Sequence, residues 1–351
     1  MTEFEKERIR KLLCQLGATV RDHVIFMRST VDSEQLASVS GVSESDTIYL
    51  IDKFSEESLL EWFSNNWPDD LPIELVVEGL EDHAPVLFPK GHCLEDTLFK
   101  VVIDPIDGTR ELMYDKRSAW VIAGVAQQKF GNNRVGDIEV AMITELPISK
   151  QRISDQISGW KGCGRAGLIP LRLNLDSGEQ TTFSINPSSA KTLEHGVAGF
   201  VKFFPEAKAL MARFETDLWK RLGYYGESKS PVIFDDQYIS TGGQMYELIV
   251  GHYRFFGDIR PEALRSIGVP ESLTCHPYDV GAGLLLSEAG CMYESPWGGV
   301  VDAPIDTVTP VSWVGYANED LAKIIKPVLQ SLLEEYFPAS KKRPLKLEAF
   351  F

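Results

Sequence analysis

The chain has 351 residues and a formal net charge of −16, from 35 basic and 51 acidic side chains. A surface this acidic repels phosphate backbones, so we expect no nucleic-acid partner. The hydrophobic fraction of 44% is typical of a globular enzyme with a sizeable core, and the length suits one large domain or about two.

The distribution of apolar and cysteine residues bears on the compartment. No window approaches 18 uninterrupted apolar residues, so we expect no membrane span. The charged N-terminus lacks the apolar stretch of a secretory signal. The five cysteines are scattered and include no CxxC pair, which favours reduced thiols over disulfides or a zinc site. These features predict a cytoplasmic protein without a membrane partner.

Two helices are expected in the first 65 residues. Apolar residues recur at helical spacing from Phe4 to Met27, with charged residues mostly opposite. The Ser-rich residues 30–45 are interpreted as a loop, after which Asp46 is placed to cap a second helix that runs to about Asn65. Asp52 lies at the edge of the buried face of that helix, and taken alone it is more simply a solvated position.

Two predicted strands end in carboxylates. Ile73–Val77 has the pattern of a strand and runs into Glu78. Residues 81–91 are polar and contain proline, which predicts a loop. Leu98–Ile103 is interpreted as a strand buried on both faces, because its apolar residues continue without alternation. Pro105 cannot donate to a ladder, so we expect this strand to end there.

The segment Asp104-Pro105-Ile106-Asp107-Gly108-Thr109 is the most informative in the chain. It holds two carboxylates, three positions apart, where a rigid strand becomes a turn, and α/β proteins place ligand chemistry at such points. A strand followed by a solvated turn is the simpler interpretation. The combination of two acids with Pro, Gly and Thr after a continuous apolar run favours a functional site.

The middle of the chain is predicted to hold strands and then helices. Strands are expected at about 119–126 and 135–144, and a hairpin across 171–185. The glycine-rich turn at 159–164 does not match a nucleotide-binding pattern. Helices are expected at about 206–221 and 244–250, and a strand at 253–258.

A second informative segment runs from Cys275 to Gly290. Asp279 is expected where a helix starts, and the small residues 281–283 allow close approach to another backbone or to an anion. Gly290 is placed to end this helix. His276 has no second histidine at ligand spacing and is interpreted as structural. A strand at 311–316 and a helix at 318–336 precede the tail.

The candidate functional residues are four carboxylates at the ends of apolar elements: Glu78, Asp104, Asp107 and Asp279. Clustered bare carboxylates raise each other's pKa, so hard cations are needed to neutralise them. Ligation by oxygen alone, without His or Cys, points to Mg²⁺ rather than zinc. A glycosidase-type acid pair is the competing interpretation. The backbone N–H groups around Gly108 form an anion nest for which a neutral sugar has no obvious use.

These residues carry a resemblance to the inositol-monophosphatase-like family of magnesium-dependent, lithium-sensitive phosphatases, a superfamily that also holds fructose bisphosphatases and phosphoadenosine-phosphate phosphatases. Residues 104–109 resemble its DPIDGT signature and residues 278–283 its second signature, WDxAAG. The similarity covers about 46–165 and 240–320, and 166–239 does not align. The resemblance implies an α/β fold of the α+β type, a layered αβαβα sandwich with mixed sheets, in a protein that is often a dimer.

The resemblance also implies roles for individual residues. Glu78, Asp104 and the carbonyl of Ile106 would bind a first Mg²⁺, and Asp104, Asp107 and Asp279 a second, with two or three ions in all. Thr109 and Asp52 would orient and deprotonate the attacking water. The amides of Gly108 and Thr109 would bind the phosphate, with Asp279 also facing the substrate.

Several departures from the family pattern concern the first metal and the substrate. The family usually has paired acids before the signature, whereas here Glu78 is followed by glycine, so either Glu78 or Glu81 is the ligand. An insertion-like stretch at 261–274 precedes Asp279, where the family faces its substrate. Arg110-Glu111-Leu112 is closer to the phosphoadenosine-phosphate phosphatases than to the inositol monophosphatases.

The sequence thus predicts a phosphomonoesterase that hydrolyses a small phosphorylated metabolite, similar to inositol monophosphate, by attack of metal-activated water on phosphorus. Phosphoadenosine phosphate and fructose bisphosphate are alternative substrates, and a non-catalytic scaffold is an alternative of another class. We expect an N-terminal half at 1–185, a C-terminal half at 186–340 and a tail at 341–351.

Overall fold

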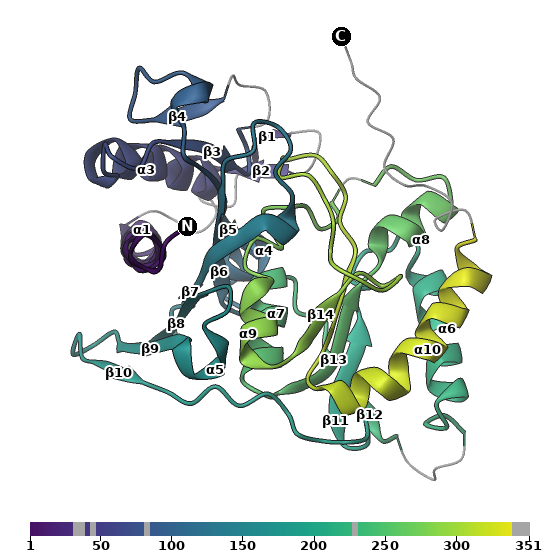
Figure 1. Ribbon diagram of the computed structural model, residues 1–351. Helices are drawn as coiled ribbons and strands as arrows, with labels where there is room; N and C mark the ends of the chain where they lie inside the picture. Colours follow the sequence, from purple (N-terminus) through teal and green to yellow (C-terminus); the bar gives the residue numbers. More distant parts are fainter. Residues whose placement is uncertain (31–38, 43–46, 81–84, 227–230, 272, 339–351) are drawn as a thin grey trace.

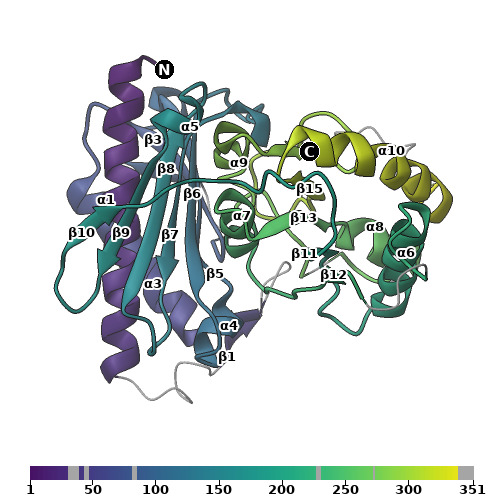
Figure 2. The same cartoon turned by 90° about the horizontal axis from the view of Figure 1, so that it is seen from below.

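The protein is built on two main β-sheets with helices outside and between them (Figures 1 and 2). This computed structural model describes residues 1–30, 39–42, 47–80, 85–226, 231–271 and 273–338, with the backbone alone for 39–42 and 47–57. The predicted tail at 341–351 therefore lies outside the described residues.

The larger sheet has eight strands in the order β10-β9-β8-β7-β6-β5-β3-β4. Its neighbours are antiparallel except for the parallel pair β3 and β5. The strands are β3 (Ile73–Val77), β4 (Val86–Phe88), β5 (Phe99–Asp107), β6 (Ala119–Gln127), β7 (Ile138–Leu146), β8 (Ile153–Trp160), β9 (Ile169–Asn174) and β10 (Gln180–Thr182).

The smaller sheet has five strands in the order β12-β11-β13-β15-β14. The first three run parallel, and β15 and β14 are antiparallel to their neighbours. The strands are β11 (Gly196–Phe200), β12 (Ile233–Phe234), β13 (Tyr253–Asp258), β14 (Met292–Glu294) and β15 (Trp313–Tyr316). A separate hairpin pairs β1 (Val39–Val42) with β2 (Thr47–Tyr49).

The helices complete five layers. On the outer face of the larger sheet, α1 (Glu3–Thr30) packs on β6, β7 and β8, and α3 (Leu50–Asn66) on β5. Between the sheets, α7 (Thr241–Ile249) contacts β6 and β13, and α9 (Leu284–Ala289) contacts β7, β8 and β14. Outside the smaller sheet lie α6 (Lys208–Arg221) and α10 (Glu319–Tyr336) (Figure 2). The predicted αβαβα sandwich with mixed sheets is confirmed.

Strand β5 is buried on both faces of the larger sheet. Val101 and Ile103 pack into the core under α1, whereas Val102, between them, packs into the core that faces α7 and α9. This alternation follows from the two-residue period of a strand. The continuous apolar run therefore places the carboxyl end of β5 deep in the molecule, where the predicted site begins.

Three short helices connect these layers: α4 (Thr109–Met113), α5 (Gly164–Gly167) and α8 (Arg260–Ser266). Among the described residues, no helix is both long and apolar enough to cross a bilayer. The predicted boundary near residue 185 falls in the connection between the two sheets, 183–195, and the division into halves stays a prediction.

Several predicted boundaries are wrong in detail. The strand does not end at Pro105: β5 continues to Asp107 through a bulge opposite β6, and a bulge tolerates the missing N–H of proline. The second helix begins at Leu50, after the short strand β2, rather than at Asp46, which lies outside the described residues. Residues 277–283 form successive turns, so the helix predicted at Asp279 begins only at Leu284.

The loops predicted at 30–45 and 81–91 each contain a short strand, β1 and β4. Strands β8, β11 and β14 were also not predicted.

Candidate metal centre

The bulge at the end of β5 presents Asp104 and Asp107 on the same side of the chain. Asp104 pairs with Ile122 of β6 and Asp107 with Trp120, so β5 has one more residue than β6 in this interval. Such a bulge re-aims side chains. Asp104 is 1% exposed and Asp107 7%. The Asp104 Oδ1 atom accepts a hydrogen bond of 2.9 Å from the N–H of Ile106, which fixes its orientation.

Asp107 reaches across to the first turn of α7. Its Oδ2 accepts bonds from the Ser240 hydroxyl at 2.7 Å and the Gly242 N–H at 2.6 Å, and its Oδ1 accepts from the Thr241 N–H at 3.1 Å. A carboxylate is favourable at this end of a helix because the first N–H groups lack intrahelical partners and the dipole is positive. Asp107 thus joins the larger sheet to the middle layer.

Gly108 allows this close approach. Its φ of +96° lies in the left-handed region. A Cβ at this position would lie 2.9 Å from the Ser240 Cβ and 3.0 Å from the Ile239 carbonyl oxygen. Glycine is therefore required here both by backbone conformation and by space.

Asp279 comes from the turns that precede α9. Its Oδ2 accepts a 2.6 Å hydrogen bond from the N–H of His276, and the interpretation of the His276 side chain as structural stays a prediction. The segment lies close against β6, where a Cβ on Gly124 would be 2.4 Å from the Gly281 carbonyl oxygen. The small residues therefore bring Asp279 up against the larger sheet.

The three aspartates meet at one place. One carboxylate oxygen from each of Asp104, Asp107 and Asp279 lies within 4.8 Å of the others. The Glu78 carboxyl, which follows β3, hydrogen-bonds that of Asp104. The Thr109 hydroxyl donates at 2.8 Å to the carbonyl oxygen of Ile106.

The electrostatics of the cluster are unfavourable without a cation. Burial, together with the charges of Asp107 and Asp279, raises the pKa of Asp104 well above its usual range. Burial raises the pKa of Asp107 to about 6, against its three hydrogen bonds and the positive charge of Arg260. Among the described residues, the cluster that could hold a cation consists of carboxylates alone, and such oxygen donors fit a hard divalent cation such as Mg²⁺.

The structure brings most of the predicted site residues together and leaves two undescribed. Glu78, Asp104, Ile106, Asp107, Gly108, Thr109 and Asp279 lie around this cluster. Asp52 lies in α3, but its side chain is outside the described part of the chain, as is Glu81. The choice between Glu78 and Glu81 as ligand stays a prediction.

Two residues at the site were not identified from the sequence. Ser240 caps α7 and also binds Asp107. The Ser-Thr-Gly-Gly start of that helix is a capping signal, but nothing in it names the distant carboxylate. Arg260 lies at the start of α8, and its charge acts on both Asp107 and Asp279.

No protein-family model matches the chain, and no curated protein sequence matches it. Solved structures do. The extragenic suppressor protein SuhB from Bartonella henselae aligns with a TM-score of 0.61 at 15% identity, over 92% of this chain and 98% of that one. An inositol monophosphatase from Thermotoga maritima gives 0.57 at 15%, over 94% and 99%. Fructose-1,6-bisphosphatase from Leishmania major gives 0.63 at 12%, over 92% and 93%.

These likenesses span nearly the whole of each chain and confirm that the fold is of the inositol-monophosphatase type.

Proposed function

We propose that the protein is a magnesium-dependent phosphomonoesterase that acts on a small phosphorylated metabolite. The observation that carries this proposal is the meeting of Asp104, Asp107 and Asp279, which come from two distant segments, beside the turn at Gly108 and Thr109. The fold shared with inositol monophosphatase and fructose-1,6-bisphosphatase structures supports the same reaction class.

The donor set divides between two cation positions. Glu78, Asp104 and the Ile106 carbonyl would hold one Mg²⁺, and Asp104, Asp107 and Asp279 a second, with Asp104 common to both. When bound, such ions lower the pKa of a coordinated water and neutralise charge on a phosphoryl group. The buried carboxylates fit this use, because their own repulsion is relieved by the same cations.

The other residues of the turn would handle the water and the phosphate. We infer that Thr109, whose hydroxyl is oriented by its bond to the Ile106 carbonyl, positions the attacking water together with Asp52. The backbone N–H groups of Gly108 and Thr109 begin α4 and suit an anionic oxygen. Asp279 would face the substrate from the opposite segment.

The experiment is a phosphate-release assay on the purified chain with Mg²⁺. The panel contains an inositol monophosphate, fructose 1,6-bisphosphate and phosphoadenosine phosphate, and the ratio of their rates assigns the substrate class. We expect a chelator to abolish activity and Asp104→Asn to abolish it with the fold intact. Release that persists in chelator would favour a metal-independent hydrolase instead.

A folded chain that releases no phosphate from any substrate, and binds no Mg²⁺ by calorimetry, would favour a non-catalytic scaffold. The intact set of acids argues against that alternative.

Further properties of the resemblance belong to the same proposal. We expect inhibition by Li⁺, a homodimer and a cytoplasmic location. Activity assayed with added LiCl tests the first, and light scattering of the purified chain tests the second.

A further inference from the structure

Each nitrogen of the Arg260 guanidinium makes a hydrogen bond next to the candidate metal centre. Its Nε lies 3.0 and 2.9 Å from the two carboxylate oxygens of Asp258, and its Nη2 lies 2.6 Å from Asp258 Oδ2. Asp258, the last residue of β13, is fully buried. A planar fork of this kind fixes the guanidinium in one orientation, which a lysine ammonium cannot reproduce.

The third nitrogen of the guanidinium, Nη1, binds the segment that precedes Asp279. Arg260 Nη1 donates at 2.6 Å to the carbonyl oxygen of Leu273, near the end of the 261–274 insertion. Leu273 has a φ of +56°, a left-handed conformation that a leucine adopts only when its surroundings impose it. The bond from Arg260 is one such constraint on the segment.

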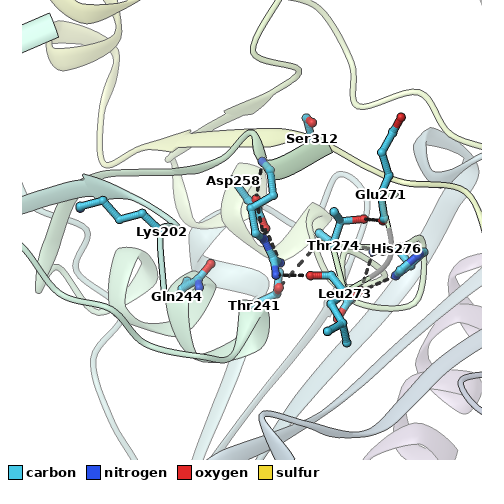
Figure 3. Close-up of polar contacts among 12 residues, drawn as sticks. Lys202, Thr241, Gln244, Asp258, Glu271, Leu273, Thr274, His276 and Ser312 are labelled. Carbon is cyan, nitrogen blue, oxygen red and sulfur yellow. Dashed lines mark hydrogen bonds and ion pairs between the residues drawn. The ribbon is translucent and has the colours of Figure 1, made fainter. Parts of the chain in front are cut away.

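From Leu273 the chain passes directly to the metal centre. Three residues later, the N–H of His276 donates to the Asp279 carboxylate. Between them, the Cys275 carbonyl accepts a 2.7 Å bond from the N–H of Val311, which holds this segment beside the residues that lead into β15. Figure 3 shows Asp258, Leu273 and His276 in the same close-up, with Leu273 between the other two. The fork therefore fixes the backbone that presents Asp279.

The guanidinium also contacts an aromatic ring. Its Cζ lies 5.0 Å from the ring centroid of Phe203, which follows β11, within the range of a cation–π contact. Arg260 is thus bound to β13, to the segment after β11 and to the insertion.

Two roles of Arg260 predict opposite effects on Mg²⁺. As a positive charge near Asp107 and Asp279, it would compete with the cation, so its removal would tighten binding. As a clamp on Leu273 it would pre-organise Asp279, so its removal would weaken binding. The bidentate pairing with Asp258 cancels most of the net charge, and for that reason the clamp is the stronger effect.

We propose that Arg260 is a positioning residue that fixes Asp279 for divalent-cation binding by holding the Leu273 carbonyl. This inference rests on the proposed function only in that the aspartate cluster binds Mg²⁺. Arg265 provides a matched control, because it lies on the same helix and pairs with Glu271 of the same insertion at its exposed side.

The experiment is calorimetric titration of Mg²⁺ into the metal-free full chain and three variants. We expect Arg260→Met to weaken affinity by about tenfold or more, as loss of a residue that orients a ligand does, and Arg265→Met to leave it within about twofold. Arg260→Lys keeps the charge but loses the fork, so it should also weaken affinity. Near-ultraviolet circular dichroism establishes that each variant is folded.

The possible outcomes separate the two proposals. Wild-type affinity in a folded Arg260→Lys overturns the clamp even if Arg260→Met does not fold. Tighter binding by Arg260→Met overturns it in favour of the charge. No Mg²⁺ binding by the wild type would overturn the proposed function and the inference together, whereas normal wild-type binding with unaffected Arg260 variants overturns the inference alone.

Discussion

Asp104 and Asp107 are two carboxylates of the same bulge with different attachments to the protein. Asp107 accepts three hydrogen bonds from the first turn of α7, whereas Asp104 accepts one from the N–H of Ile106 and lies against the Glu78 carboxyl. The three donors offset part of the cost of burying the Asp107 carboxylate. Asp104, surrounded by like charges, opposes the stability of the metal-free protein.

The two corresponding asparagine variants should differ in stability. Asp104→Asn keeps the acceptor for Ile106 and gains an N–H donor for Glu78, so the free energy of unfolding without metal should stay level or rise by up to about 1 kcal/mol. Asp107→Asn turns an N–H₂ group toward N–H donors and should cost about 1–3 kcal/mol. Urea denaturation in chelator measures both, and equal losses would contradict this division of roles.

The raised pKa values predict an unusual pH dependence. The pKa of Asp107 is about 6 in the folded protein and 3.8 in the reference state, so between about pH 4 and about pH 6 the folded state binds more protons. The free energy of unfolding should therefore fall as pH rises through this window, on the order of 2 kcal/mol. Asp104 acts in the same direction.

Saturating Mg²⁺ should abolish this fall, because it stabilises the deprotonated carboxylates. Urea midpoints across the window, with chelator and with Mg²⁺, provide the measurement. Parallel pH profiles in the two conditions would count against cation binding by these aspartates.

At the scale of elements, the contact between the end of β5 and the start of α7 depends on one glycine. Gly108 and Gly131 both have a left-handed φ, of +96° and +86°. Only at Gly108 would a Cβ meet neighbouring atoms, those of Ser240 and Ile239, whereas a Cβ at Gly131 would meet nothing within 4 Å. The pair therefore separates backbone strain from crowding.

Gly131→Ala should cost about 1 kcal/mol of stability, from the backbone conformation alone. Gly108→Ala should cost about 1–3 kcal/mol more, since α7 must move away from the turn. It should also weaken Mg²⁺ binding, which Gly131→Ala should leave unchanged. Thermal denaturation and metal titration test the pair. Equal losses of stability in the two variants would mean that α7 moves away from the added Cβ at little cost.

Elements that carry a long apolar pattern were predictable, and elements defined by their neighbours were not. The strands Ile73–Val77 and Tyr253–Asp258 were predicted with their observed bounds, because each holds several large apolar residues within five or six positions. Strands β4 and β12, of three and two residues, form by pairing with longer strands and have little pattern of their own. The continuation of β5 through Pro105 depends on a bulge that β6 completes.

At the scale of the whole molecule, Arg117 and Tyr238 join the larger sheet to the middle layer. Arg117 pairs with Asp236 and Glu247, and its Cζ lies 3.6 Å from the Tyr238 ring centroid. The Tyr238 hydroxyl accepts a 2.8 Å bond from Trp120 Nε1 and donates at 2.7 Å to the Ser118 carbonyl. Both bonds are buried.

Removal of the Tyr238 hydroxyl leaves two buried groups of the larger sheet without a partner. Tyr238→Phe should therefore lower the free energy of unfolding by about 2 kcal/mol. Tyr225→Phe is the control, because that side chain is 56% exposed, and its effect should be close to zero. Both are measured by urea denaturation, and an equally small effect of the two variants would show that the buried bonds contribute little.

The candidate site was predictable as far as its chemistry is local. Acids at the ends of Ile73–Val77 and β5 could be identified one strand at a time, and Asp279 by a second motif. The attachment of Asp107 to Ser240 depends on how layers pack, and that of Arg260 to Leu273 on how the residues after α8 fold back onto it. Neither kind of bond produces a periodic pattern in the sequence. Such bonds were found only in the folded chain.

The middle layer of helices has a consequence for dissection of the gene. Asp104 and Asp107 precede the connection at 183–195, whereas α7 and Asp279 follow it. Cleavage there would yield two fragments. In the first, an apolar face of the larger sheet would be exposed, and Asp107 would lose its hydrogen-bond donors. In the second, the first turn of α7 would lose the carboxylate that accepts its N–H groups. Co-expression of the two fragments should restore the cation site only when they reassemble, so under the proposed function the pair would form a split reporter read by phosphate release.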